Sequence, residues 1–245
     1  MPAVLVHGVP DTPVMWDAIR AQLSRADVVA VNLPGFACAA TDFGATKEDY
    51  VDWLIGEIEA LGEPVDLVGH DWGSILVQHV ASQRPDLIRT WAAGSGPVDR
   101  DYVWHDMAQT WQTPGAGEDA VARTVAAPAA VRADRFRSLG MGAASDRVAA
   151  AIDADMGRCI LSLYRSGAQP SMANWGRDLP AAAKRPGLVI VPTEDQYTGG
   201  EAMALRAAAR AGARSVVLQG RGHWWMCEDP ALGARVLNEF FASLT

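Results

Sequence analysis

Short apolar runs recur along the chain, separated by stretches in which apolar residues return every three or four positions. The runs predict buried β-strands at residues 3–6, 27–32, 65–69, 88–93, 187–192 and 214–219. The intervening stretches predict helices near residues 14–23, 47–61, 72–83, 200–211 and 230–243, and Thr46 is suited to cap the second of them. This alternation predicts an α/β fold, with a mostly parallel sheet covered by helices on both faces.

Residues 95–185 interrupt this alternation. They are rich in alanine and other helix-forming residues, for example at 120–131 and 146–165, and they contain little strand pattern. We therefore expect an α/β core of residues 1–94 and 186–245, with residues 95–185 forming a helical insertion.

The sequence Gly69-His70-Asp71-Trp72-Gly73 lies where the third predicted strand meets its helix. Small residues flanking one central residue at such a junction are typical of a tight turn that presents a nucleophile. With Asp71 at the centre the nucleophile is a carboxylate, which can displace at an sp³ carbon and form an alkyl ester. The alternative is an ordinary turn in which Asp71 only caps the following helix.

Two further residues at strand ends have the chemistry that such a nucleophile needs. His223 lies on a glycine-rich loop after the last strand and is a candidate general base. Asp195 follows another strand and can accept a hydrogen bond from the imidazole. The alternatives for this acid are the neighbouring Glu194 and the more distant Asp99 and Asp101.

The order Asp71, Asp195, His223 matches the order nucleophile, acid, histidine of α/β-hydrolases. The first strand is followed by His7-Gly8-Val9-Pro10. With these motifs the chain resembles the epoxide hydrolase and haloalkane dehalogenase branch of the α/β-hydrolase superfamily, over residues 3–240. The resemblance implies that the insertion is a cap placed after the sixth strand of the family's sheet, although the family's initial antiparallel hairpin is not apparent. Ser74 stands where relatives often have a second glycine, and we expect it to crowd the helix against the sheet.

The resemblance also implies roles for single residues. The backbone N–H groups of Val9 and Trp72 would form the oxyanion hole, since Pro10 has no N–H to offer. Tyr164 lies in a segment similar to the tyrosine-arginine cap segment of epoxide hydrolases, where a phenol protonates the epoxide oxygen. Epoxide hydrolases generally have a second such tyrosine. The candidate here is Tyr102, and the alternatives in its place are Trp104 and His105.

Aromatic residues of the insertion and of the His223 loop are expected to wall a dry, apolar substrate pocket, with plain core packing as the alternative. These candidate substrate-binding residues are Tyr102, Trp104, Trp111, Trp175 and Trp224.

Composition, charge and cysteine spacing limit the partners, the cofactors and the cellular compartment that we expect. The 245 residues are 49% hydrophobic, enough for one large core, and the net charge of −8 disfavours a nucleic-acid or anionic-membrane partner. No apolar run approaches a membrane span, and no signal peptide is expected. Cys38, Cys159 and Cys227 have no paired or metal-like spacing, which indicates free thiols in a reducing cytoplasm. We expect no metal and no cofactor, a small and largely apolar substrate, and a monomer or homodimer.

These observations predict a hydrolase that acts through an aspartyl alkyl-ester intermediate, converting an epoxide to a vicinal diol. The first alternative is a haloalkane dehalogenase, in which the indole of Trp72 would bind the halide, although Val9 replaces the asparagine that many dehalogenases carry. The others are another α/β-hydrolase activity or a ligand-binding receptor without catalysis.

Overall fold

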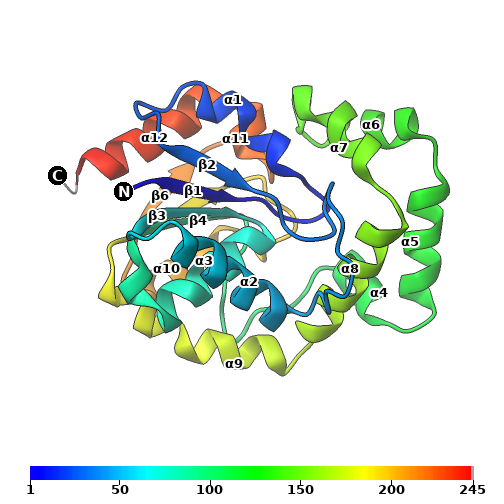
Figure 1. Ribbon diagram of the computed structural model, residues 1–245, viewed down its shortest axis with the longest axis horizontal. Coiled ribbons are helices and arrows are strands. Elements are labelled where there is room, and N and C mark those ends of the chain that lie inside the picture. The colour runs from blue at the N-terminus through cyan, green and yellow to red at the C-terminus, as the bar shows by residue number, and fades with distance from the viewer. Residues whose placement is uncertain (244–245) are drawn as a thin grey trace.

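The computed structural model describes residues 1–243 and has a six-stranded, fully parallel sheet at its centre (Figure 1). Each strand lies within one residue of its predicted bounds, and the α/β prediction is confirmed. The order across the sheet is β2-β1-β3-β4-β5-β6. The strands are β1 (Ala3–Val6), β2 (Val28–Val31), β3 (Val65–His70), β4 (Ile88–Gly94), β5 (Gly187–Pro192) and β6 (Arg214–Leu218).

Helices cover both faces of this sheet. One face carries α1 (Asp17–Arg20), α11 (Trp225–Glu228) and α12 (Pro230–Ala242); the other carries α2 (Lys47–Ala60), α3 (Trp72–Gln83) and α10 (Gly200–Arg210) (Figure 1). Thr46 caps α2 as expected, in a reciprocal capping box with Asp49. The helix predicted over 14–23 is instead a 3₁₀ turn, Pro13–Trp16, followed by the four-residue α1, and a further 3₁₀ turn, Pro85–Leu87, precedes β4.

Only helices lie between β4 and β5. They are α4 (Asp106–Gln112), α5 (Ala116–Ala126), α6 (Ala129–Ser138), α7 (Ser145–Ala151), α8 (Ala154–Ser166) and α9 (Ser171–Asp178), with 3₁₀ turns at Gly142–Ala144 and Leu179–Lys184. The helix predicted over 120–131 breaks at Pro128, the N-cap of α6. The helix predicted over 146–165 breaks at Asp153, whose carboxylate accepts a hydrogen bond from the Met156 N–H at 2.8 Å and so caps α8.

The helical insertion lies beyond the carboxyl ends of the strands, on the side to which their arrows point (Figure 1). It follows β4, the fourth strand of the chain. Because residues 1–243 contain no strands that correspond to the two of the family's initial hairpin, this position is the one after the sixth strand of the family's sheet, as predicted. The parallel sheet therefore directs the loops after β1, β3, β5 and β6 toward the insertion.

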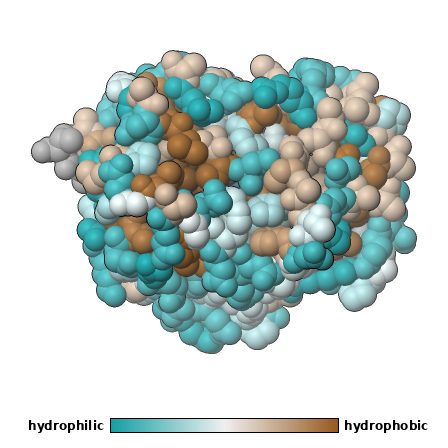
Figure 2. All heavy atoms as spheres, in the orientation of Figure 1, coloured by the Kyte–Doolittle hydropathy of each residue, from teal (hydrophilic) through white to brown (hydrophobic). Residues whose placement is uncertain are grey.

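On the face seen in Figure 2, hydrophilic residues surround several separate hydrophobic groups. Of the helices within residues 1–243, none combines the length and the apolar character needed to cross a membrane. Cys38, Cys159 and Cys227 are free thiols.

Ser74, in the first turn of α3, joins the ends of β3 and β4. Its hydroxyl lies 2.8 Å from the carbonyl oxygen of Gly69 and 2.5 Å from that of Gly94, and it accepts a hydrogen bond from the Gly94 N–H at 2.7 Å. The same Gly94 carbonyl accepts the N–H of Asp71 at 3.1 Å. We expected Ser74 to crowd the helix against the sheet. It instead bridges the strand ends that hold the Asp71 turn.

Replacing Ser74 by alanine removes this bridge and leaves a buried N–H without its hydroxyl acceptor. We expect Ser74→Ala to lower the free energy of unfolding by about 1–3 kcal/mol, measured by urea denaturation. The control is Ser82→Ala, because the buried Ser82 hydroxyl only donates to the Gln78 carbonyl of its own helix. Equal, small losses for the two variants would contradict the bridging role.

Candidate functional site

The turn between β3 and α3 consists of one residue, Asp71. Its φ of 52° and ψ of −123° lie in a region that side-chain-bearing residues rarely adopt. The turn fits only because glycines surround it. A Cβ on Gly8 would lie 2.3 Å from the Asp71 Cβ, and a Cβ on Gly73 would lie 2.2 Å from the Val6 carbonyl oxygen. The backbone therefore presents the Asp71 carboxylate at the carboxyl edge of the sheet, at the cost of local strain.

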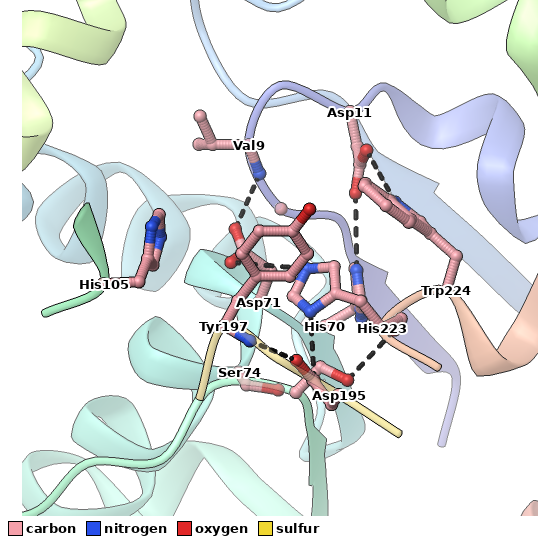
Figure 3. Close-up of polar contacts among 12 residues, drawn as sticks. Val9, Asp11, His70, Asp71, Ser74, His105, Asp195, Tyr197, His223 and Trp224 are labelled. Carbon is pink, nitrogen blue, oxygen red and sulfur yellow. Dashed lines mark hydrogen bonds and ion pairs between the residues drawn. The ribbon is translucent and has the colours of Figure 1, made fainter. Parts of the chain in front are cut away.

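Asp71, His223 and Asp195 lie in a line from three different loops (Figure 3). The His223 Nε2 lies 3.7 Å from Asp71 Oδ2, and its Nδ1 lies 3.0 Å from Asp195 Oδ2. The second Asp195 oxygen accepts the Tyr197 N–H at 2.9 Å. The geometry thus brings together the predicted nucleophile, base and acid, with the base within a short movement of a reacting group on Asp71.

The alternatives for the acid lie elsewhere. Asp99 is buried against Arg210, at 2.6 Å, and Asp101 pairs with the same arginine at 3.1 Å. Glu194 is exposed, and no contact joins it to His223. Of these candidate acids, only Asp195 contacts the imidazole.

Burial and charge oppose each other at this site. Burial raises the pKa of Asp71 to about 6, although His223 and the N–H groups of Trp72 and Val9 favour its charged form. Burial lowers the pKa of His223, but the carboxylates of Asp195 and Asp71 outweigh it and raise that pKa to about 9. In the structure the backbone N–H of Val9 donates a hydrogen bond to Asp71 Oδ1 at 2.8 Å. Both predicted oxyanion-hole donors, from Val9 and Trp72, therefore already face the carboxylate.

A second buried acid and histidine lie behind His223. Asp11 accepts a hydrogen bond from Trp224 Nε1 at 3.0 Å and lies 3.5 Å from His70 Nε2, while the His70 and His223 rings lie 4.7 Å apart (Figure 3). Burial and the Asp71 charge raise the pKa of Asp11 to about 7. We missed both residues in the sequence, although they adjoin the His-Gly-x-Pro motif and the nucleophile.

A cavity of about 370 Å³ opens above Asp71 and His223, between the core and the insertion. Its walls are mainly apolar, as expected for a small-molecule site. Of the predicted substrate-binding aromatics, Trp111 and Trp224 line it, as does Tyr164.

Tyr164 is fixed among indole rings. Its ring lies edge-on to Trp72 at 5.3 Å and tilted against Trp111 at 4.7 Å. Burial and the charge of Asp71 raise the pKa of its phenol well above the usual value. The phenol therefore stays protonated near neutral pH, and it lies on the cavity wall beside Trp72.

Three predicted pocket aromatics do not line the cavity. The Tyr102 hydroxyl donates to the Tyr197 carbonyl at 3.0 Å, and Trp104 Nε1 donates to the Gly167 carbonyl at 2.8 Å. Both rings lie behind the wall, where Trp104 stacks on Trp72 at 5.3 Å. Contrary to our expectation, the structure therefore does not place these two rings on the cavity wall, because backbone carbonyls occupy their polar groups and core packing covers their faces.

Trp175 is farther from the cavity. It lies on α9, which packs against α3. Its ring stacks on His79 at 3.7 Å, and the buried Lys47 ammonium lies 4.1 Å from its centre. Trp175 joins the insertion to the core and does not line the cavity.

His105 and Tyr197 line the cavity instead. The Tyr197 ring lies between them, 5.3 Å from His105 and 5.0 Å from His223 (Figure 3). His105 caps α4, since its Nδ1 accepts the Ala108 N–H at 3.3 Å, and this contact places the remaining proton on Nε2. Burial and the charge of His223 lower the His105 pKa to about 4, so the ring is neutral near pH 7. No sequence pattern marks Tyr197, which simply follows the acid by two residues.

Within residues 1–243 there is no group of three His, Cys, Asp or Glu side chains arranged to hold a metal ion. The polar groups that face the cavity are instead those of acid–base and hydrogen-bonding chemistry.

Proteins of known activity match the chain over part of its length. It is 35% identical to epoxide hydrolase 3 of Siraitia grosvenorii over 94 residues, 35% of this chain and 29% of that protein. It is 31% identical to a haloalkane dehalogenase of Mycolicibacterium paratuberculosis over 103 residues, 39% of this chain and 34% of that protein. It is 33% identical to (E)-2-((N-methylformamido)methylene)succinate hydrolase of Acinetobacter baylyi over 105 residues, 42% of this chain and 40% of that protein. These matches span less than half of each relative.

The fold is that of known enzymes over nearly its whole length. A crystal structure of haloalkane dehalogenase DbeA from Bradyrhizobium elkani superposes with a TM-score of 0.76 at 23% identity, covering 99% of this chain and 90% of that one. A structure of DBJA gives a TM-score of 0.80 at 22% identity, covering 99% and 91%. The sequence profile of the Alpha/beta hydrolase family matches residues 3–236. The chain therefore belongs to the alpha/beta hydrolase family.

Proposed function

We propose that the protein hydrolyses epoxides to vicinal diols through an ester on Asp71. The observation that carries this proposal is the placement of two kinds of group on one cavity. The Asp71 carboxylate lies at its base, 3.7 Å from His223 Nε2, and the protonated Tyr164 phenol lies on its wall. The Asp71 carboxylate can attack and open an epoxide ring. The Tyr164 phenol can then protonate the alkoxide oxygen that the opening produces.

In the first step an Asp71 oxygen attacks an epoxide carbon and the carbon–oxygen bond of the ring breaks. The Tyr164 phenol donates its proton to the departing alkoxide oxygen. His105 Nε2–H, fixed as a donor by the helix cap, supplies a second hydrogen bond in place of the second tyrosine expected in the family. The product of this step is a hydroxyalkyl ester of Asp71.

In the second step His223 takes a proton from a water molecule, which attacks the ester carbonyl carbon. Esterification removes the negative charge of Asp71, which is one of the charges that raise the His223 pKa. Once the ester exists, the histidine therefore gives up its resting proton more readily, to the Tyr164 phenolate that the first step left, and can then act as the base. The Val9 and Trp72 N–H groups stabilise the tetrahedral oxyanion. As it collapses, the ester C–O bond breaks, the leaving alkoxide takes a proton from His223 and becomes the diol, and the Asp71 carboxyl returns its proton to His223.

Haloalkane dehalogenation is the second candidate, and one observation favours it. The Trp72 indole Nε1 is buried beside the Tyr164 phenol and makes no hydrogen bond of normal geometry. An indole N–H beside the nucleophile can hold a leaving halide, and relatives and fold neighbours bear the name haloalkane dehalogenase. Bromide release from a bromoalkane panel, assayed beside diol formation, distinguishes the two.

Isotope labelling tests the ester route. In one turnover with enzyme in excess in H₂¹⁸O, we expect an unlabelled diol and a gain of about 2 Da on the peptide that contains Asp71, because water attacks the carbonyl carbon and its oxygen stays on the carboxylate. Peptide and product mass spectrometry measure both. Label in the first-turnover diol would mean direct attack by water on the epoxide and would contradict the proposal.

Removing the phenol tests the proton donor. We expect Tyr164→Phe to lower kcat/KM for an epoxide about 100-fold, since one lost oxyanion donor costs about 10²–10³. The matched control is Tyr102→Phe, whose hydroxyl donates to a backbone carbonyl behind the wall and which should change the rate by no more than a few-fold. Equal effects of the two substitutions would exclude Tyr164 as the donor.

A further inference from the structure

The outer part of the cavity carries two arginines without partners. Arg123 of α5 and Arg135 of α6 line the cavity and are exposed. No described residue forms an ion pair or a side-chain hydrogen bond with either guanidinium. By contrast, Arg137 of α6 pairs with Asp134 at 2.6 Å and with Asp146 at 3.1 Å. Two unpaired cations therefore face one cavity in a chain whose net charge is −8.

A third arginine holds the corner between these two helices. Arg132 Nη1 donates to the carbonyl oxygens of Val125 and Ala127 at 2.9 and 2.6 Å, and its Nε donates to that of Ala149 at 3.1 Å. These bonds fix the end of α5 relative to α6 and α7. The corner thus keeps Arg123 and Arg135 on the same cavity.

The base of the cavity disfavours the binding of an anion. The Asp71 carboxylate faces it, and Asp195 and Asp11 lie buried behind His223. A carboxylate bound there would add a further negative charge in a desolvated place. An anionic group on a ligand therefore fits only at the arginine end.

The surface between the two ends is apolar. Phe136 lines the wall, and Met107, Val131 and Leu139 line it while exposing 38%, 59% and 36% of their surface. Exposed apolar side chains beside cations favour a ligand that joins an aliphatic chain to an anion. Guanidinium forks match carboxylates in pairs of hydrogen bonds, so a carboxylate suits this site.

We propose that the substrate is an aliphatic acid whose electrophilic carbon reaches Asp71 while its carboxylate binds Arg123 and Arg135. This inference rests on the proposed function for the reacting group and adds the other end of the molecule. It places the carboxylate away from the reacting carbon, across the length of the cavity.

The test compares epoxyalkanoic acids, with a terminal epoxide and a range of chain lengths, with their methyl esters. At low ionic strength we expect kcat/KM for the best acid to exceed that of its ester about tenfold, and this preference to shrink as salt screens the charges. Arg123→Gln and Arg135→Gln should each lower kcat/KM for the acid about three- to tenfold and leave the ester within twofold. The control is Arg137→Gln, on the same helix but paired elsewhere, which should alter neither.

A binding measurement separates this inference from the chemistry. By titration calorimetry we expect octanoate to bind the wild-type protein more tightly than octanol, and the Arg123→Gln/Arg135→Gln double variant to lose that preference. Epoxide turnover without preference for the acid would overturn the arginine site and leave the proposed function standing. If no epoxide is turned over, the proposed function fails, and the octanoate preference alone then decides the arginine site. Equal binding of octanoate and octanol would exclude it.

Discussion

The structure of the site depends on one backbone constraint, the single-residue turn at Asp71. β3 ends at His70 and α3 begins at Trp72, so one residue with φ of 52° reverses the chain direction. The turn requires the close approach of Gly8 and Gly73, and Ser74 ties it to the ends of β3 and β4. The parallel sheet then brings the loops of Asp195 and His223 to the same edge. Strain in one turn thus fixes the direction of the carboxylate on which the other groups converge.

The electrostatics of the proposed reaction follow from the same position. A buried carboxylate with a pKa near 6 and a histidine with a pKa near 9 stabilise each other as an ion pair. Esterification removes the negative charge of Asp71, so the pKa of His223 falls and the imidazole loses its proton more readily. In this account the protein stores the proton on His223 until the ester exists. Burial raises the pKa of Tyr164, so its phenol stays protonated near neutral pH until the epoxide oxygen takes the proton.

Local patterns predicted the core of this molecule well, because strands buried in a parallel sheet are short apolar runs and because the motif at Asp71 needs glycines. The motifs also identified Asp71, Asp195 and His223, which the structure brings together, while the family resemblance implied Val9 and Trp72. The helical character of the insertion was predicted as well, but not which of its aromatic residues line the cavity. Aromatic residues such as Trp104 and Trp175 look alike in sequence whether they pack in a core or line a cavity, and only the three-dimensional packing distinguishes the two. His105 was a candidate only through the family resemblance, and Tyr197 reaches the cavity from a loop that no periodicity marks.

The most direct test of the central claim is the intact mass of His223→Gln protein after exposure to an epoxide. That variant retains Asp71 but lacks the base that removes the ester. The account predicts a stable gain equal to the whole mass of the epoxide, located on Asp71 by peptide mapping. A gain equal to an alkyl group without its halogen, from haloalkanes only, would assign the dehalogenase reaction instead. An unmodified protein that still forms diol would contradict the role of Asp71.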